Sequence, residues 1–228
     1  MTTGIDWQAI WLTAKLATIV SALLLLVGLP LAYWLAFTRA KWQFVVEAVV
    51  ALPLVLPPTV LGFYALLAMG ARSPVGRWYE SWSGHTLVFS FQGLVLASVL
   101  YSLPFAVQPF AASFTQIDRR LLDASALLGA SRWQTFVRTI APLSLGGIVR
   151  GVVLSFAHTV GEFGVVLMVG GNIPGATRTI SLDIYDKVQD LDYAGANHTA
   201  LLLLIFSFVA LLAIYGSGRR PWQNWMSR

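Results

Sequence analysis

Residues 16–38 read LATIVSALLLLVGLPLAYWLAFT and contain no charged side chain. About 20 consecutive apolar residues are enough for an α-helix to cross the roughly 30 Å hydrocarbon core of a bilayer. Four more stretches are comparable, at residues 48–71, 81–117, 139–177 and 199–218, and only the third is interrupted, by Arg150 and Glu162. The sequence therefore predicts an all-α integral membrane protein with five transmembrane helices.

The composition agrees with this prediction, since 57% of the residues are hydrophobic and only 11% are charged, against roughly a quarter charged in a soluble domain. The predicted spans cover about residues 9–37, 45–70, 87–114, 142–169 and 198–217. No repeat or low-complexity linker divides residues 1–228, so we expect a single membrane domain.

The first span could be mistaken for a secretory signal peptide. It is too long for the apolar part of a signal, carries Lys15 near its start and lacks a small-residue cleavage site. We therefore expect it to be a transmembrane helix. The chain has no cysteine, which excludes disulfide bonds and thiolate metal sites.

Basic residues are distributed unevenly over the connectors. Nine lie in alternate connectors and the C-terminal segment: Arg39, Lys41, Arg119, Arg120, Arg132, Arg138, Arg219, Arg220 and Arg228. The other two connectors hold four: Arg72, Arg77, Arg178 and Lys187. The positive-inside rule then places the N-terminus outside and the C-terminus in the cytoplasm. Membrane topology accounts for the net charge of +5 without nucleic-acid binding.

Prolines interrupt the predicted spans. The second span contains Pro53, Pro57 and Pro58, and prolines also occur in the first and third spans, at Pro30, Pro104 and Pro109. A proline removes a backbone donor and kinks or breaks a helix. Broken backbone at membrane depth is tolerated where it is buried in protein or lines a wet cavity. We expect Pro57, Pro58 and Thr59 to line such a cavity; a kinked helix that only packs well is the alternative.

The fourth span carries ionisable side chains. Glu162 lies between Gly161 and Gly164 near the outer end of the span, and an intramembrane carboxylate indicates function because its burial is unfavourable. His158 precedes it by four residues on the same helical face, and we expect a hydrogen-bonded pair; a metal site would lack a second ligand pair. Arg150 either snorkels to the cytoplasmic face or faces an inner vestibule. Gly147 and Gly151 permit close helix approach.

The connector at residues 118–141 predicts a short helix within a segment of about residues 119–131. Asp118 or Asp123 could begin it, Gly129 would end it, and its face would consist of Ala124, Ser125 and Leu128. Such small side chains suit a knob that fits into another protein's groove. An amphipathic helix lying on the membrane surface is the alternative.

This connector resembles the EAA signature of bacterial ABC-importer permeases, which reads Glu-Ala-Ala, three residues, Gly, nine residues and Ile-x-Leu-Pro. The spacing matches from Asp123-Ala124-Ser125 through Gly129 to Pro142. Asp123 replaces Glu, Ser125 replaces the second Ala, and Thr139 and Ala141 stand where Ile and Leu are usual. Three further segments resemble molybdate permease subunits: residues 52–62, residues 161–164, and residues 172–179 with Ile184-Tyr185.

The resemblance implies a non-catalytic permease of the type I importer fold that forms a homodimer and receives its oxyanion from an extracytoplasmic binding protein. It implies docking of two ATPase subunits, which bind ATP and Mg. The coupling residues would be Asp123, Ala124, Ser125, Gly129, Arg132 and Pro142. The chain itself has no Gly-x4-Gly-Lys-Ser/Thr motif, so we expect it to bind no cofactor.

The path of a tetrahedral dianion needs hydrogen-bond donors, and Thr59, Ser102 and Ser155 could supply hydroxyl groups. A carboxylate would repel the ion, so we expect Glu162 to gate or stabilise the path by accepting hydrogen bonds from backbone N–H groups. Residues 180–193 predict a surface helix that contacts the binding protein, with a solvated loop as the alternative.

Alternative functions remain. Sulfate and tungstate permeases share much of the pattern. A secondary transporter would normally show inverted repeats and several buried carboxylates, whereas this sequence has one intramembrane carboxylate in an odd number of spans. A membrane enzyme would need a catalytic constellation that the sequence lacks.

Overall fold

The computed structural model describes residues 5–217, which form twelve α-helices and one π-helix. In chain order they are α1 (Trp7–Phe37), α2 (Gln43–Val55), α3 (Pro58–Met69), α4 (Pro74–Ser83), α5 (Phe91–Thr115), α6 (Arg119–Leu127), α7 (Arg132–Thr135), the π-helix η1 (Phe136–Ile140), α8 (Ala141–Leu143), α9 (Leu145–Val160), α10 (Gly164–Gly170), α11 (Ile180–Gln189) and α12 (Tyr193–Ser217). The all-α class predicted from the sequence is confirmed.

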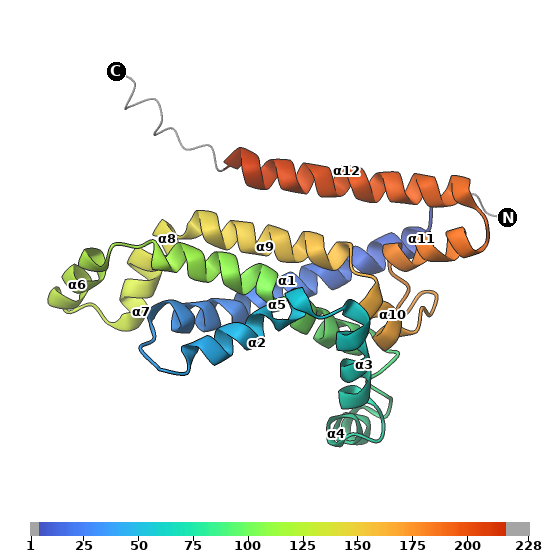
Figure 1. Ribbon diagram of the computed structural model, residues 1–228, viewed down its shortest axis with the longest axis horizontal. Coiled ribbons are helices and arrows are strands. Elements are labelled where there is room, and N and C mark those ends of the chain that lie inside the picture. The colour runs from blue at the N-terminus through green and yellow to red at the C-terminus, as the bar shows by residue number, and fades with distance from the viewer. Residues whose placement is uncertain (1–4, 218–228) are drawn as a thin grey trace.

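Helices α1, α5 and α9 pack side by side and form the core (Figure 1). Leu16, Leu24 and Phe110 are completely buried between them. Glycines allow this close packing, because a Cβ on Gly151 would collide with the Phe110 ring and one on Gly147 with the Ser113 side chain. The close approach predicted for Gly147 and Gly151 is confirmed, and α5 is the helix they face.

Two of the predicted spans are broken rather than straight. The chain bends by 113° between α2 and α3, around Leu56 and Pro57, and α3 runs across the direction of the core helices (Figure 1). It bends by 75° between the segments 132–143 and 145–160. The fourth predicted span also ends early, because α9 stops at Val160 and α10 starts separately at Gly164.

The interruptions expected in the first and third spans are wrong. Pro30 lies inside the continuous 31-residue α1, and Pro104 and Pro109 lie inside the continuous 25-residue α5. Packing on both sides holds these helices together despite the missing backbone donors, since α1 and α5 are each other's most extensive neighbours. At Pro57 and Pro58 the side chains are exposed and the chain is free to turn.

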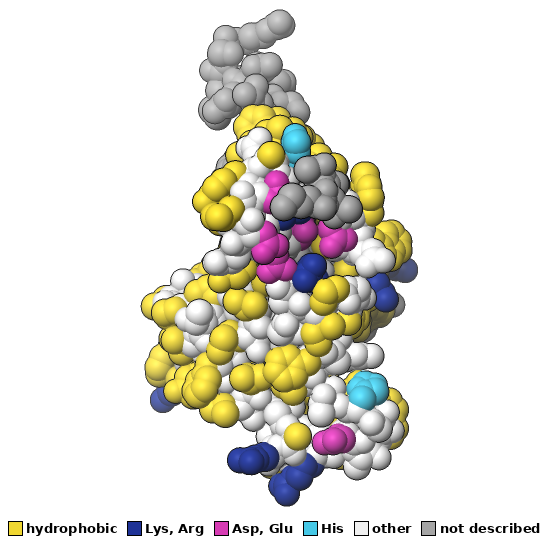
Figure 2. All heavy atoms as spheres, turned by 90° about the vertical axis from the view of Figure 1, so that its right-hand side faces the viewer, with side chains coloured by type: hydrophobic (Ala, Val, Ile, Leu, Met, Phe, Trp, Pro, Cys, Tyr) yellow, Lys and Arg dark blue, Asp and Glu magenta, His cyan; other side chains and the backbone are white. Residues whose placement is uncertain are grey.

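Charged connectors lie at opposite ends of the long helices. The α1–α2 connector with Arg39 and Lys41 and the α6–η1 segment lie at the left in Figure 1, and we call this the basic end. Helix α11 and the start of α1 lie at the other end, where acidic side chains gather beside basic ones (Figure 2). We call this the acidic end. Which end faces the cytoplasm stays a prediction, and Arg219, Arg220 and Arg228 lie outside the described residues.

Three helices within residues 5–217, namely α1, α5 and Tyr193–Leu212 of α12, are long and apolar enough to cross a membrane, and the number rises to five if each bent pair is one span. Helix α12 packs on α11 and α9 along one side of the core. Its apolar side chains are mostly exposed, Leu204 by 65% and Phe208 by 59%. Such a surface belongs in lipid or against another protein.

Candidate translocation site and coupling helix

The two helix breaks nearest the acidic end touch each other. A Cβ on Gly164, the first residue of α10, would lie 2.8 Å from Pro58 Cβ, and a Cβ on Gly62 would lie 2.8 Å from Met168 Cβ. Glycines therefore hold the start of α3 against α10. Two proline- and glycine-rich segments that are a hundred residues apart in the sequence form one structural unit.

A cavity of about 510 Å³ lies at this junction. Pro58 and Thr59 from α3, His158 from α9 and Glu162 from the α9–α10 connector line it, together with Tyr101 of α5. Of the residues that we expected along a translocation path, the structure thus brings together Pro58, Thr59, His158 and Glu162, whereas Ser102 is not part of the wall. Pro57, although adjacent, is not part of the wall.

Ser155 does not reach this cavity. It is fully buried, and its hydroxyl group donates a hydrogen bond of 3.0 Å to the Val152 carbonyl group of its own helix. The expectation that Ser155 offers a hydroxyl donor to a passing ion is wrong. Back-bonding to the preceding turn is the common alternative for serine within a helix.

Glu162 is the most unusual side chain of the site. It is only 3% exposed, and within residues 5–217 neither carboxylate oxygen has a hydrogen-bond partner. The Ser98 hydroxyl group on α5 faces this carboxyl group, but it too makes no hydrogen bond. The expected hydrogen bonds from surrounding backbone N–H groups are absent in this part of the chain, because the N–H groups of Gly161 and Glu162 bond to the last carbonyl groups of α9.

His158 is bonded to α5 and not to Glu162. Its Nδ1 lies 2.9 Å from Ser102 Oγ, which also lies 2.9 Å from Thr159 Oγ1. Its ring stacks on Phe105 at 3.8 Å between centroids. The predicted His158–Glu162 pair is wrong because α9 ends at Val160, so the two residues do not share a helical face.

Of the two buried serines that α5 contributes, sequence reasoning named Ser102 as a hydroxyl donor but missed Ser98. Ser98 and Ser102 are completely buried and lie one helical turn apart, facing Glu162 and His158 respectively. Ser98 and Ser102 are four residues apart, which places both on one face of a helix. That spacing in an apolar span was the available signal. Within residues 5–217 no group of three or more His, Asp or Glu side chains could hold a metal ion.

Helix α6 projects from the basic end, as Figure 1 shows. Asp118, one of the two predicted starting residues, caps it by accepting a hydrogen bond of 2.9 Å from the Arg120 N–H group. Gly129, at φ +74°, follows its last residues, and the Ala130 N–H group returns to the Ser125 carbonyl group. Gly129 therefore ends the helix as expected, and the helix covers Arg119–Leu127 of the predicted segment 119–131.

The surface of α6 is open to contact. None of its residues is buried, and Leu127 and Leu128 are 89% and 87% exposed. The predicted face of Ala124, Ser125 and Leu128 is partly correct, because Ser125 Oγ donates to the Leu121 carbonyl group and is not free. Arg132 starts α7 and Pro142 lies in α8, so both stand behind α6 rather than on it.

The segment of residues 172–178 forms a rigid turn tied to α11 at the acidic end. Asn172 Nδ2 donates to Asp186 Oδ1 at 2.7 Å, and Arg178 pairs with Asp186 at 3.2 Å. Thr177 Oγ1 bonds to the Gly170 carbonyl group at 2.6 Å. The expected surface helix is present as α11, but Val188 and Leu191 point outward, 41% and 71% exposed.

Residues 28–220 match the family described as the binding-protein-dependent transport system inner membrane component. The chain belongs to this family. The chain is also similar to the molybdenum transport system permease protein ModB of Azotobacter vinelandii, at 50% identity over 94% of this chain and 95% of that protein's length. The ModB protein of Escherichia coli strain K12 is 36% identical over 91% of each chain.

The fold of the family is also the fold observed here. A crystal structure of a bacterial ABC transporter involved in alginate import superimposes with a TM-score of 0.74, at 18% sequence identity, over 94% of this chain and 79% of that chain. The family match and the ModB relatives make the chain an integral membrane permease, and its fold is that of ABC-importer permeases.

Proposed function

We propose that this chain is the permease subunit of an ATP-driven importer that moves molybdate across the cytoplasmic membrane. The 50% identity to a molybdenum transport permease, over nearly the whole of both chains, carries this proposal. Tungstate and sulfate have the same tetrahedral shape and charge and are the alternative cargoes. ATP hydrolysis comes from a partner subunit, and an extracytoplasmic binding protein delivers the oxyanion.

In this proposal the basic end faces the cytoplasm, and a homodimer of the permease binds two ATPase subunits through α6. The exposed leucines at the tip of α6 would fill an apolar groove on the ATPase, with Asp123 and Ala124 beside them. Arg132 and Pro142 would act indirectly, by fixing the direction in which α6 leaves the membrane domain. The resemblance of residues 123–142 to the EAA signature supports this docking.

The cavity at the α3–α10 junction is the proposed outer gate. Its wall of Pro58, Thr59, Tyr101 and His158 offers only weak polar contacts, as a path requires that must release its ion. An exposed Glu162 carboxylate would repel an oxyanion, so its buried position keeps this charge away from the ion path in the structure. Exposure of Glu162 then has to be coupled to a movement of α10 against α3.

Docking through α6 is tested by replacing Gly129 with Asp in the chain co-expressed with its ATPase. Gly84 is a matched control, because both glycines have positive φ, +74° and +78°, and a Cβ at either position meets nothing within 4 Å. An aspartate at either position therefore has the same unfavourable left-handed backbone conformation, which costs about 1–2 kcal/mol. We expect Gly129→Asp alone to lose the two-plus-two complex and its vanadate-sensitive ATP hydrolysis.

Equal behaviour of the two variants would contradict docking through α6. The cargo needs a separate measurement, in proteoliposomes containing the complex, ATP and the binding protein. Molybdate uptake that survives an excess of sulfate is the expected result; uptake that sulfate abolishes would make this a sulfate permease.

A further inference from the structure

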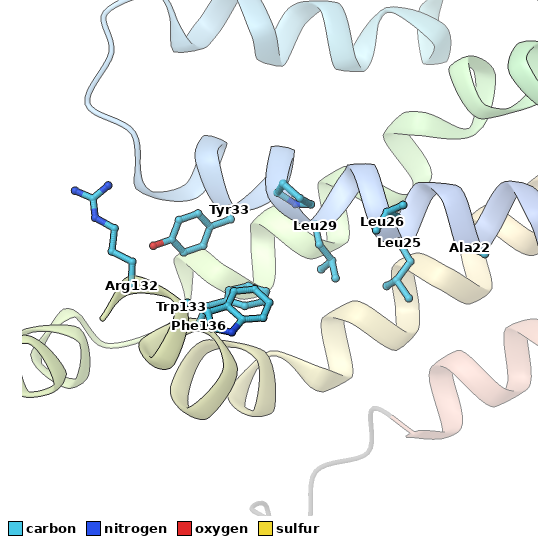
Figure 3. Close-up of a pocket in the computed structure, with 9 residues that line it drawn as sticks. Ala22, Leu25, Leu26, Leu29, Tyr33, Arg132, Trp133 and Phe136 are labelled. Carbon is cyan, nitrogen blue, oxygen red and sulfur yellow. The ribbon is translucent and has the colours of Figure 1, made fainter. Parts of the chain in front are cut away.

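A long apolar groove runs along α1 at the basic end. It has a volume of about 670 Å³, and α1 forms one wall with Leu25, Leu29 and Tyr33. Trp133 and Phe136, from α7 and η1, form the other wall (Figure 3). The groove lies at the opposite end of the molecule from the proposed gate and shares no residue with it.

The groove results from the bend in the chain before α9. The segment 132–143 turns by 75° away from the direction of α9, and its Trp133 and Phe136 face α1 across the groove. The π-helix η1 widens the turn and directs Phe136 toward α1, where its ring meets the Tyr33 ring edge-on at 5.7 Å. Trp133 stacks on Phe136 at 5.9 Å, so the aromatic wall is held in place.

A single basic side chain, Arg132, lies at one end of the groove. The Arg132 side chain lies beside Tyr33, and Leu29, Leu26, Leu25 and Ala22 follow along α1 away from it (Figure 3). Among the described residues Arg132 has no acidic partner within salt-bridge distance. Trp133 is 72% exposed at the same level, as interfacial tryptophans are. The site combines an apolar channel with a positive, aromatic rim.

The dimensions decide between a lipid chain and a protein helix. Ala22 to Tyr33 spans eleven residues of α1, or about 16 Å, which is close to half of the roughly 30 Å hydrocarbon core. Spread over that length, about 670 Å³ gives a mean cross-section of roughly 40 Å². An α-helix 10–12 Å wide needs roughly 80 Å² or more. The groove is one leaflet deep and too narrow for a helix.

We propose that this groove binds an anionic phospholipid of the leaflet at the basic end, with an acyl chain along Leu25 and Leu29 and the phosphate group on Arg132. Since α7 follows α6 after four residues, the bound lipid braces the segment that holds α6. The site requires only that the chain spans a membrane, and it does not depend on which ion is carried.

The test uses the full-length chain reconstituted in equal amounts of phosphatidylglycerol and phosphatidylcholine, extracted in mild detergent, with retained lipid counted by native mass spectrometry. Arg132→Gln is expected to lower retained phosphatidylglycerol about fivefold, the factor that corresponds to ~1 kcal/mol for one Lys or Arg at an anionic membrane surface. Arg138→Gln is the matched control, because Arg138 is also exposed but lies outside the groove.

A second pair of variants tests the apolar part. Ala22→Trp fills the inner end of the groove and is expected to lower retention of both lipids, whereas Val27→Trp, on an exposed face of α1 outside the groove, is not. Equal retention of the two lipids by the unmodified chain, or no effect of Arg132→Gln, would overturn the proposal. A change of oligomeric state in Ala22→Trp without lipid loss would assign the groove to a second copy of the chain.

Discussion

Glu162 is buried without hydrogen-bond partners among the described residues, at the break between α9 and α10. A carboxylate placed in the protein interior without hydrogen bonds is strongly unfavourable, and Glu162 is 97% buried with both oxygens unpartnered among the described residues. Such a group persists only where function requires it or where the surrounding structure changes during the transport cycle. Its position in the α9–α10 break makes a second arrangement of this segment accessible.

Replacing Glu162 with Gln should therefore separate gating from folding. We expect the variant to assemble with its ATPase, to melt at the same or a higher temperature, and to hydrolyse ATP at least twofold faster without the binding protein, because the closed gate is less well defined. ATPase assays with and without binding protein provide the measurement. Glu80→Gln, at an exposed position of α4, is the control; unchanged coupling in Glu162→Gln would contradict a gating role.

Two glycines in neighbouring helices should respond to alanine with opposite signs. A Cβ at Gly164 would lie 2.8 Å from Pro58 Cβ, whereas a Cβ at Gly146 meets nothing within 4 Å. Overpacking costs typically 1–3 kcal/mol, while alanine in an open helical position gains about 1 kcal/mol. Gly164→Ala should lower the melting temperature of the purified protein and Gly146→Ala should raise it. A harmless Gly164→Ala would show that α3 and α10 are not tightly apposed.

At the scale of helices, residue types predicted where helices begin and end better than whether a helix continues through a proline. The cap at Asp118, the turn at Gly129 and the break at Pro57 and Pro58 follow from residue types alone. The continuity of α5 through Pro104 and Pro109 does not, because packing against α1 and α9 decides it. The separation of His158 from Glu162 depends equally on where α9 ends, which hydropathy cannot show.

Of the two acidic residues Asp186 and Asp190, only Asp190 is suited to test the contact of α11 with a binding protein. Asp186 is unsuitable for charge reversal, since it holds Asn172 and Arg178 and its loss would disturb the whole turn. Asp190 is exposed at the end of α11. We expect Asp190→Lys to reduce binding-protein-stimulated ATP hydrolysis by a factor of about five and to leave the basal rate unchanged. The control variant Glu80→Lys should show full stimulation. Full stimulation of Asp190→Lys would remove α11 from the docking surface.

Over the whole molecule, the basic connectors and the candidate gate lie toward opposite ends of the long helices. The connectors with Arg39, Lys41 and Arg132 and the projecting α6 lie at one end, and the α3–α10 cavity lies toward the other. Hydropathy predicts that apolar segments exist but not that α3 runs across the others, because a 113° turn leaves the composition of residues 45–70 unchanged. The cavity depends on this turn, so its wall could be predicted only in part.

The orientation itself is directly measurable because the chain contains no cysteine. A single cysteine at Lys41, exposed in the α1–α2 connector, marks the basic end, and one at Ser81, exposed in α4, marks the side to which the α3–α4 connector leads. In cells whose outer membrane has been permeabilised while the cytoplasmic membrane stays intact, a membrane-impermeant maleimide should label Ser81→Cys at once. It should label Lys41→Cys only after the cytoplasmic membrane is permeabilised, because the positive-inside rule keeps the basic connectors in the cytoplasm. The reverse pattern would turn α6 away from any cytoplasmic ATPase and would contradict the proposed import mechanism as a whole.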